Sequence, residues 1–208
     1  FNNMMIKKID VTAIILAGGK SERMNGKDKG LLRINNQYVI KHLYNLSKNY
    51  SGNVYINANR NIDDYIKMGF EVWQDIIPGY QGPLAGMYTS LKNSKTQYIL
   101  TLPCDGPLVN AIYFERMLRV SDENKVELRS AHNGERLQPV YSLISIDLIT
   151  SLKSFLDSGQ RKIDKWFGLC KLEEIDFSDN KNLFININKE SDLLEYRELI
   201  NKHFNDYE

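Results

Sequence analysis

The chain has 208 residues, of which 42% are hydrophobic and 25% are charged, and its formal net charge is +1. This composition is typical of soluble globular proteins and excludes collagen-like, coiled-coil and mainly disordered chains. The near-zero net charge argues against a nucleic-acid partner, and the longest apolar run, residues 13–17, is too short to span a membrane. We therefore expect a soluble, cytoplasmic protein with neither nucleic-acid nor membrane partners, in which any phosphate chemistry depends on a local cluster of charges.

The first half of the chain alternates short apolar strands with helical patterns. Residues 11–17 are nearly all apolar and rich in β-branched side chains, which is typical of a strand buried on both faces. We predict further strands at 54–56, 71–73 and 98–102, and helices at 38–46, 63–68 and 84–91. Such alternation predicts an α/β fold, a three-layer α/β/α sandwich with right-handed crossovers, in which ligands bind at the carboxyl ends of the strands.

The second half continues with a different pattern. Two strand-like runs, 126–131 and 137–143, flank the turn His132-Asn133-Gly134 and resemble a hairpin. We also predict helices at 111–120, 145–156, 161–169 and 191–204, and a strand near 172–175. Because no repeat or low-complexity linker interrupts the chain, residues 1–208 are predicted to form one domain.

The strongest chemical signal is the glycine-rich loop after the first strand. Gly18 and Gly19 begin a stretch that runs to Lys29 and holds four Lys or Arg residues, Lys29 included. Glycines let backbone N–H groups approach an anion, and Arg23 and Lys29 can neutralise charge on a transferring phosphoryl group. The loop matches neither the Walker A pattern nor Gly-x-Gly-x-x-Gly. A surface turn with solvated charges is the alternative, but four basic residues at the end of a buried strand favour phosphate binding.

Three acidic or amide side chains are predicted to share this edge of the sheet. Asp105 follows the strand at 98–102, and its carboxylate suits Mg²⁺, which is usually bound by one or two carboxylates, waters and substrate phosphates. A structural aspartate in a turn between two prolines is the alternative. Asn57 and Asp75 end two other strands and could bind a base or ribose, although turn and cap roles are equally favoured for each.

Several other chemistries are excluded or weakly supported. Gly82 precedes the helix predicted at 84–91 and Gly86 lies in its first turn, where small residues permit close approach either of a ligand or of the sheet. His42, His132 and His203 show no metal-ligand spacing, and Gly-x-Ser-x-Gly is missing. The sequence therefore supports neither a zinc enzyme nor a serine hydrolase.

Taken together, six segments resemble the molybdenum cofactor guanylyltransferases, the MobA-type enzymes. In chain order they are Leu-Ala-Gly-Gly-x-x-x-Arg-Met from residue 16, Asp28-Lys29, Asn57-Ala58-Asn59-Arg60, Asp75, Gly82-Pro83-Leu84-Ala85-Gly86 and Pro103-Cys104-Asp105. Six linked motifs are far more specific than any one of them. The resemblance implies a Rossmann-like nucleotidyltransferase fold with a mostly parallel central sheet. It also implies transfer of GMP from Mg²⁺-GTP to the phosphate of molybdenum-bound molybdopterin, with release of pyrophosphate.

The resemblance further implies which residues bind each substrate. Arg23, Lys29 and Asp105 form the implied catalytic set, in which Asp105 also holds Mg²⁺. The nucleotide is assigned to Leu16, Ala17, Gly18, Gly19, Lys29, Asn57, Asp75 and Asp105. The pterin is assigned to Gly82, Gly86, Arg161, Asn186 and Asn188. Nucleotide binding thus falls in about 11–110 and pterin binding in about 111–208, and molybdenum-insertion proteins and molybdoenzyme chaperones are among the implied partners.

Two residue patterns depart from the family. Asn25 stands where the family usually has Gly, and Lys189-Glu190 replaces a usual Thr-Pro after Asn188. Because Asn tolerates a left-handed backbone, Asn25 changes little, whereas Lys189-Glu190 weakens the assignment around Asn188.

Transfer of GMP to a phosphate requires no general base, and other nucleotidyltransferases catalyse the same type of reaction. The second pKa of a phosphate monoester is about 6, so the pterin phosphate is largely ionised at neutral pH. A cytidylyltransferase acting on the same cofactor and a sugar-phosphate nucleotidyltransferase are alternatives, since fold alone does not separate them. Gly18 favours GTP, because Leu-Ala-Gly-Gly tends to accompany guanine in the resembling families. From another class, a nucleotide-binding regulator without turnover is the remaining alternative.

Overall fold

A computed structural model of the chain describes residues 3–18, 29–34, 36–79, 82–121 and 126–205. At its centre lies a seven-stranded sheet. Its strands are β2 (Val11–Leu16), β5 (Asn53–Asn57), β6 (Val72–Trp73), β7 (Tyr98–Pro103), β9 (Leu128–His132), β10 (Leu137–Ser145) and β11 (Leu172–Asp176). The spatial order is β11-β9-β10-β7-β2-β5-β6. Only β10 runs antiparallel to its neighbours in this sheet, so the expected mostly parallel sheet and the β9–β10 hairpin are confirmed.

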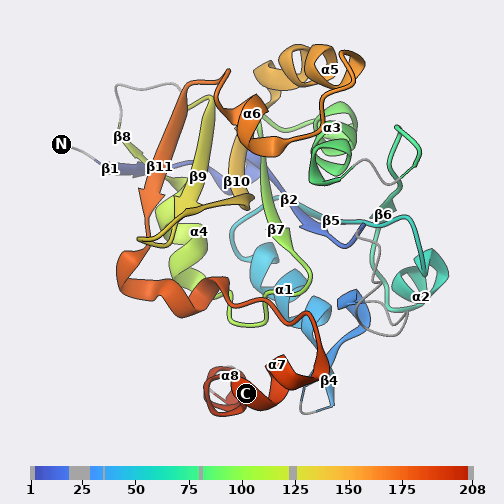
Figure 1. Cartoon of the computed structure of the whole chain (residues 1–208), viewed down its shortest axis with the longest axis vertical. Helices are drawn as coiled ribbons and strands as arrows, with labels where there is room; N and C mark the ends of the chain where they lie inside the picture. Colours follow the sequence, from blue (N-terminus) through green and yellow to red (C-terminus); the bar gives the residue numbers. More distant parts are fainter. Residues whose placement is uncertain (1–2, 19–28, 35, 80–81, 122–125, 206–208) are drawn as a thin grey trace.

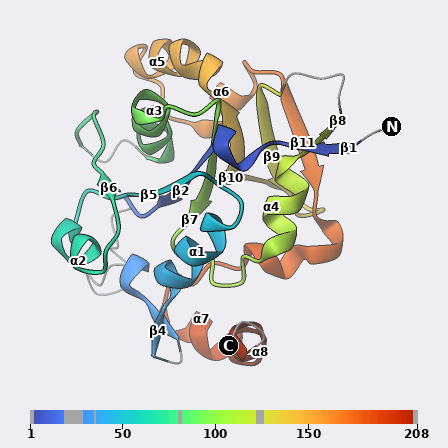
Figure 2. The same cartoon turned by 180° about the vertical axis from the view of Figure 1, so that it is seen from behind.

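Helices cover both faces of the sheet, as Figures 1 and 2 show from opposite sides. One layer holds α3 (Pro83–Asn93), α5 (Ile149–Asp157) and α6 (Ile163–Phe167), and the other holds α1 (Val39–Lys48) and α4 (Ala111–Leu118). Along β2, Ile14 packs in the core under α3, whereas Ala13 and Ile15 pack in the core under α1 and α4. All three side chains are fully buried, which explains why β2 reads as an uninterrupted apolar run. The three-layer α/β/α sandwich is therefore confirmed.

The sheet register brings the ends of three parallel strands together. Leu16 at the end of β2 pairs with Pro103 of β7 on one side and with Asn57 of β5 on the other. The backbone N–H of Cys104 then donates to the carbonyl of Leu16 (3.1 Å), and that of Ala17 to the carbonyl of Asn57 (2.8 Å). The segments that follow these strands consequently begin side by side.

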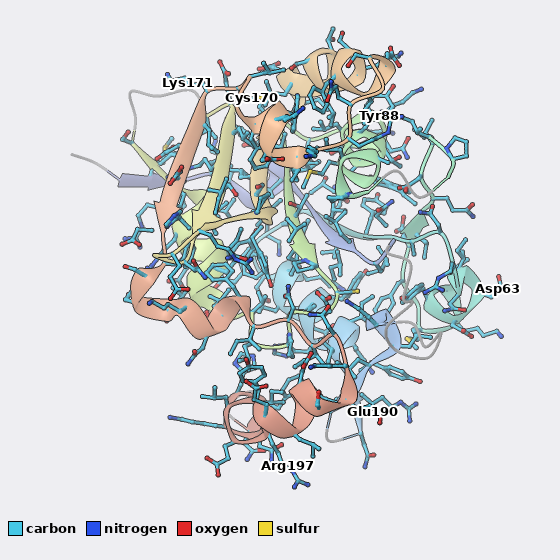
Figure 3. The ribbon with its side chains drawn as sticks, viewed as in Figure 1. Asp63, Tyr88, Cys170, Lys171, Glu190 and Arg197 are labelled. Carbon is cyan, nitrogen blue, oxygen red and sulfur yellow. The ribbon has the colours of Figure 1, made fainter. Side chains whose placement is uncertain are left out.

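The C-terminal segment crosses back over the molecule after β11. It forms the 3-10 helix η4 (Ser178–Phe184), then α7 (Glu190–Glu195) and α8 (Arg197–Asn205). Figure 3 labels Glu190 and Arg197 at the starts of these two helices, at the opposite end of the view from Cys170. Ile200 and Phe204 bury α8 in the core that also contains α1. The single helix predicted at 191–204 is therefore wrong, because the chain leaves helical geometry at Tyr196 without a glycine or proline to mark the break.

Several short elements also differ from the sequence prediction. The helix predicted at 111–120 ends at Leu118, because the next residues form β8 (Arg119–Ser121), which pairs with β1 (Asn3–Met5). The helix predicted at 145–156 begins as the 3-10 helix η3 (Ile146–Leu148). The remaining elements are α2 (Ile62–Lys67), η1 (Lys8–Asp10), η2 (Lys29–Leu31), β3 (Arg33–Ile34) and β4 (Gln37–Tyr38). Within the described ranges, every helix is too short or too polar to cross a membrane.

Candidate functional site

A lysine, an aspartate and an asparagine from three distant parts of the chain meet at the carboxyl ends of β2 and β7. Lys29 begins η2, Asp105 follows β7, and Asn188 lies just before α7. The ammonium of Lys29 donates to the Asp105 carboxylate, with 3.1 Å between Nζ and Oδ2, and also to Oδ1 of Asn188. We call these three residues the Lys29 cluster. The predicted association of Lys29 with Asp105 at one sheet edge is thus found, and Asn188 joins it.

The Lys29 cluster is only partly exposed to water. The side chain of Lys29 is 24% exposed and that of Asp105 is 13% exposed. A backbone hydrogen bond from the N–H of Ile187 to the carbonyl of Asp105 (2.9 Å) holds the C-terminal segment against the loop after β7. Partial exclusion of water strengthens the interactions of these charges with one another and with any anion that reaches them. The cluster can therefore bind an anion at Lys29 while keeping a carboxylate beside it.

A single carboxylate, that of Asp105, suits Mg²⁺ when a phosphorylated substrate supplies further ligands. No group of three or more His, Cys, Asp or Glu side chains that could hold a metal ion occurs among the described residues. Mg²⁺ retains several waters and is commonly held by one or two carboxylates together with substrate phosphates. Asp105 thus suits a magnesium ion that is bound jointly with a phosphorylated substrate.

Tyr141 anchors the segments beneath the Lys29 cluster. Its side chain on β10 is fully buried, and its hydroxyl donates to Oδ1 of Asn186 (3.4 Å). Burial, followed by the negative charge of Asp105, raises the pKa of Tyr141 well above its ordinary value, so the hydroxyl stays protonated. A Cβ atom on Gly106 would lie 2.4 Å from this hydroxyl, so only glycine fits there without movement. Tyr141 thus supports the loop that carries Asp105, a role that depends on contacts formed only in the folded chain.

A second polar group lies where β5 and β6 end. Both carboxylate oxygens of Asp75 accept amide hydrogen bonds, Oδ1 from Asn57 (2.9 Å) and Oδ2 from Asn59 (2.8 Å). The backbone N–H of Asp75 donates back to Oδ1 of Asn59 (2.9 Å). Asp75 therefore orients two amides, and the predicted pair of Asn57 and Asp75 is indeed brought together. Sequence reasoning included Asn59 in the motif Asn57-Ala58-Asn59-Arg60 but assigned nucleotide binding only to Asn57; the position of Asn59 two residues further on in extended chain could have indicated that both side chains share one face.

Gly86 makes room for the amide of Asn57, and Gly18 lies beside the amides of Asn57 and Asn59. A Cβ atom added to Gly86 in α3 would lie 2.2 Å from Oδ1 of Asn57, and one added to Gly18 would lie 3.6 Å from the same oxygen and 3.3 Å from Nδ2 of Asn59. The side chain of Leu16 also lies against Gly86. Gly86 is thus required for the close packing of α3 on the end of β5, and its contact is with a predicted nucleotide-binding residue.

We expect Gly86→Ala to disturb the amide network of Asn57 and Asp75. The new methyl group must displace the Asn57 amide, and overpacking of this kind costs about 1–3 kcal/mol. Gly168→Ala is the matched control, because a Cβ there meets its nearest neighbour at an ordinary 3.5 Å. Thermal unfolding and calorimetric nucleotide titration of both variants check this. Equal melting temperatures and equal nucleotide affinities for the two variants would contradict it.

The other predicted residues are not brought into these two groups. Arg161 donates to the carbonyl of Leu156 (2.7 Å) at the end of α5, and the α5–α6 connection lies in the helix layer at the opposite end of Figure 1 from α7. Gly82 is the N-cap of α3, with φ +80°. Gly19 and Arg23 lie outside the described residues. Their predicted roles stay predictions.

The cysteines of the chain are not disposed as nucleophiles. Cys104, beside Asp105, is buried. Burial raises the pKa of the Cys170 thiol to about 11, which keeps it protonated at neutral pH. Figure 3 shows Cys170 and its neighbour Lys171 far from Glu190, which lies near Asn188 in the chain. Covalent catalysis by either thiol therefore finds no support in the geometry.

Known proteins resemble this chain in both sequence and structure. The model of the MobA-like NTP transferase domain matches residues 13–174. A protein of Shewanella sediminis named molybdenum cofactor guanylyltransferase is 43% identical over 180 residues, which cover 86% of this chain and 92% of that protein. A solved structure named molybdopterin-guanine dinucleotide biosynthesis protein A, from Archaeoglobus fulgidus, matches with a TM-score of 0.74 and 18% identity over 92% of this chain and 99% of that one.

The same fold also occurs in a solved structure whose name gives a different substrate. The inositol-1-phosphate CTP transferase from T. maritima matches with a TM-score of 0.64 and 14% identity, over 96% of this chain and 98% of that one. At this level of identity the likeness concerns the fold alone. The identity of the nucleotide must therefore be argued from sequence relatives and tested by binding.

Proposed function

The chain belongs to the MobA-like NTP transferases, and from that premise we propose that it transfers GMP from GTP to the phosphate of molybdenum-bound molybdopterin. The reaction forms the guanine dinucleotide form of the molybdenum cofactor. The pterin phosphate attacks the α-phosphorus of GTP, a new oxygen–phosphorus bond forms, and the bond to the β-phosphate oxygen breaks to release pyrophosphate. Because the attacking phosphate is already largely ionised, the residues need only to align two anions and neutralise their charge.

The observation that carries this proposal is the Lys29 cluster. The ammonium of Lys29 lies 3.1 Å from the carboxylate of Asp105, at the edge where nucleotides bind in folds of this class. Lys29 supplies positive charge for the phosphates, and Asn188 keeps its ammonium directed into the site. When bound, Mg²⁺ held by Asp105 would supply further charge neutralisation at the phosphates. Arg23 is proposed to act beside Lys29.

The substrates are proposed to bind on two sides of the cluster. The nucleotide side consists of Leu16, Ala17, Gly18, Gly19, Lys29, Asn57, Asp75 and Asp105, within about 11–110. For the pterin, the resemblance assigns Gly82, Gly86, Arg161, Asn186 and Asn188, most of them in about 111–208. Of these, Asn188 bonds to Lys29 and Asn186 to Tyr141, whereas Gly86 packs on Asn57 and Arg161 bonds to the end of α5. A cytoplasmic location and contacts with molybdenum-insertion proteins and molybdoenzyme chaperones belong to the same proposal.

Calorimetric titration with GTP, CTP and ATP, each with Mg²⁺, is the first test of this function. We expect a clear preference for GTP, followed by pyrophosphate release once molybdenum-bound molybdopterin is added. A preference for CTP would replace the proposal with cytidylyl transfer. Tight GTP binding without pyrophosphate release in the presence of the pterin substrate would replace it with a nucleotide-binding regulator.

A further inference from the structure

The carboxylate of Asp192 lies behind Asn188 and is turned away from solvent. Asp192 is only 8% exposed, in a helix whose other first-turn residues are exposed. Its Oδ2 accepts the backbone N–H of Asn188 (2.7 Å) and that of Lys189 (3.1 Å). Hydrogen bonds from backbone N–H groups to a carboxylate are among the strong ones in proteins. One buried side chain thus holds the backbone on both sides of the bond between Asn188 and Lys189.

Lys189, the residue before α7, cannot accept a hydrogen bond from the first turn of this helix through its side chain. In a complete capping box, the N-cap side chain accepts a hydrogen bond from the third helical residue while the third residue bonds back to the N-cap. Here the N-cap is Lys189, whose ammonium has no acceptor atom. Its Nζ reaches only to 4.0 Å from Oδ1 of Asp192 and is exposed. The side-chain hydrogen bonds that fix the backbone between Asn188 and α7 therefore come from Asp192. A Ser or Thr at the N-cap would add a second side-chain bond there and make the junction less dependent on Asp192.

The same junction determines where the Lys29 ammonium lies. Asn188 accepts from Lys29 through its side chain while its own backbone N–H is held by Asp192. On the preceding residue, the N–H of Ile187 is held by the carbonyl of Asp105. Asn188 is thus fixed from both sides, and its amide oxygen can hold Lys29 in only a narrow range of positions.

We propose that Asp192 is a positioning residue for the transfer reaction, which acts through Asn188 to place the Lys29 ammonium. The proposal rests on the function proposed above. Displacement of a reacting or charge-bearing group by about 1 Å can lower a rate by about 100-fold. We expect Asp192→Ala to lower kcat/KM for GMP transfer by about tenfold or more and to weaken GTP binding. Asp192→Asn, which keeps an acceptor oxygen of the same reach, should retain most of the activity.

A double-mutant cycle separates positioning from a general loss of stability. Because Asp192 acts through Asn188, Asp192→Ala should lower kcat/KM by less than about threefold in an Asn188→Ala background. Asp164→Ala, which removes a first-turn acid from α6, is the matched control and should leave kcat/KM unchanged. Additive losses in the cycle, or wild-type kcat/KM in a folded Asp192→Ala variant, would overturn the proposal.

Hydrogen exchange of the Asn188 and Lys189 amides tests the role of Asp192 independently of the transfer reaction. In Asp192→Ala, the amides of Asn188 and Lys189 should lose protection, and the affinity for GTP with Mg²⁺ should fall. If the wild-type protein binds GTP but transfers no GMP, the proposed function fails while these two measurements still decide the role of Asp192. Unchanged protection of both amides together with unchanged GTP affinity would overturn the positioning role whatever reaction the protein catalyses.

Discussion

Asp105→Asn should abolish most of the turnover while the protein remains folded. The substitution keeps the size of the side chain but removes the negative charge that suits Mg²⁺ and that faces Lys29 at 3.1 Å. Loss of a group that stabilises charge in the transition state typically costs 10²- to 10³-fold in kcat. We therefore expect kcat for GMP transfer to fall about 1,000-fold, measured as pyrophosphate release at saturating GTP, Mg²⁺ and pterin substrate.

The fold should tolerate this change because the pair of Lys29 and Asp105 is partly solvated. Because the two side chains are only 24% and 13% exposed, loss of one charge should cost more than in an exposed ion pair, about 1–3 kcal/mol, and the melting temperature should fall by no more than about 10 °C. Asp157→Asn is the matched control, because the Asp157 carboxylate also pairs with a lysine, Lys153, but on the exposed surface of α5. Turnover within about threefold of wild type in folded Asp105→Asn would contradict the assignment of Asp105.

The parts of the fold that sequence patterns predicted are those in which burial is continuous. Both β2 and β7 are buried along nearly their whole length, so each appears as an apolar run that no helix or loop pattern imitates. The pairing of β1 with β8 joins residues more than 100 positions apart, and each strand has three residues. Such a pair leaves no periodicity, and its residues were therefore assigned to a helix end or left without structure.

In the candidate site, too, some features could be predicted from the sequence and others could not. Lys29 and Asp105 could be predicted to meet, because each follows a buried parallel strand and such strands end at one edge of the sheet. The roles of Asn59, Tyr141 and Asp192 depend on partners that only the tertiary structure brings close. In particular, the bond between Lys29 and Asn188 spans 159 positions in the chain. Sequence reasoning named both residues from their motifs but could not place one against the other.

Lys29→Ala should weaken GTP binding and lower kcat/KM for GMP transfer by about 100-fold. The ammonium carries the positive charge of the Lys29 cluster, and its interaction with phosphate oxygens is strengthened by the partial exclusion of water. The variant also leaves the Asp105 carboxylate without this cation, which adds repulsion toward an incoming phosphate. Calorimetric titration with GTP and Mg²⁺, and the pyrophosphate assay, measure the two effects separately.

Lys29→Arg and a double variant sharpen this prediction. A guanidinium is larger and planar, so it cannot reproduce the compact contacts of Lys29 with Oδ2 of Asp105 and Oδ1 of Asn188, and we expect Lys29→Arg to rescue little activity. Lys153→Ala removes an exposed lysine and should bind GTP as the wild type does. Because Lys29 and Asp105 act on the same phosphates, their combined loss should be smaller than the product of the single losses. Full multiplicative losses in the double variant would show that the two residues do not act as one unit. Unchanged GTP affinity in folded Lys29→Ala would contradict the phosphate-binding role of Lys29.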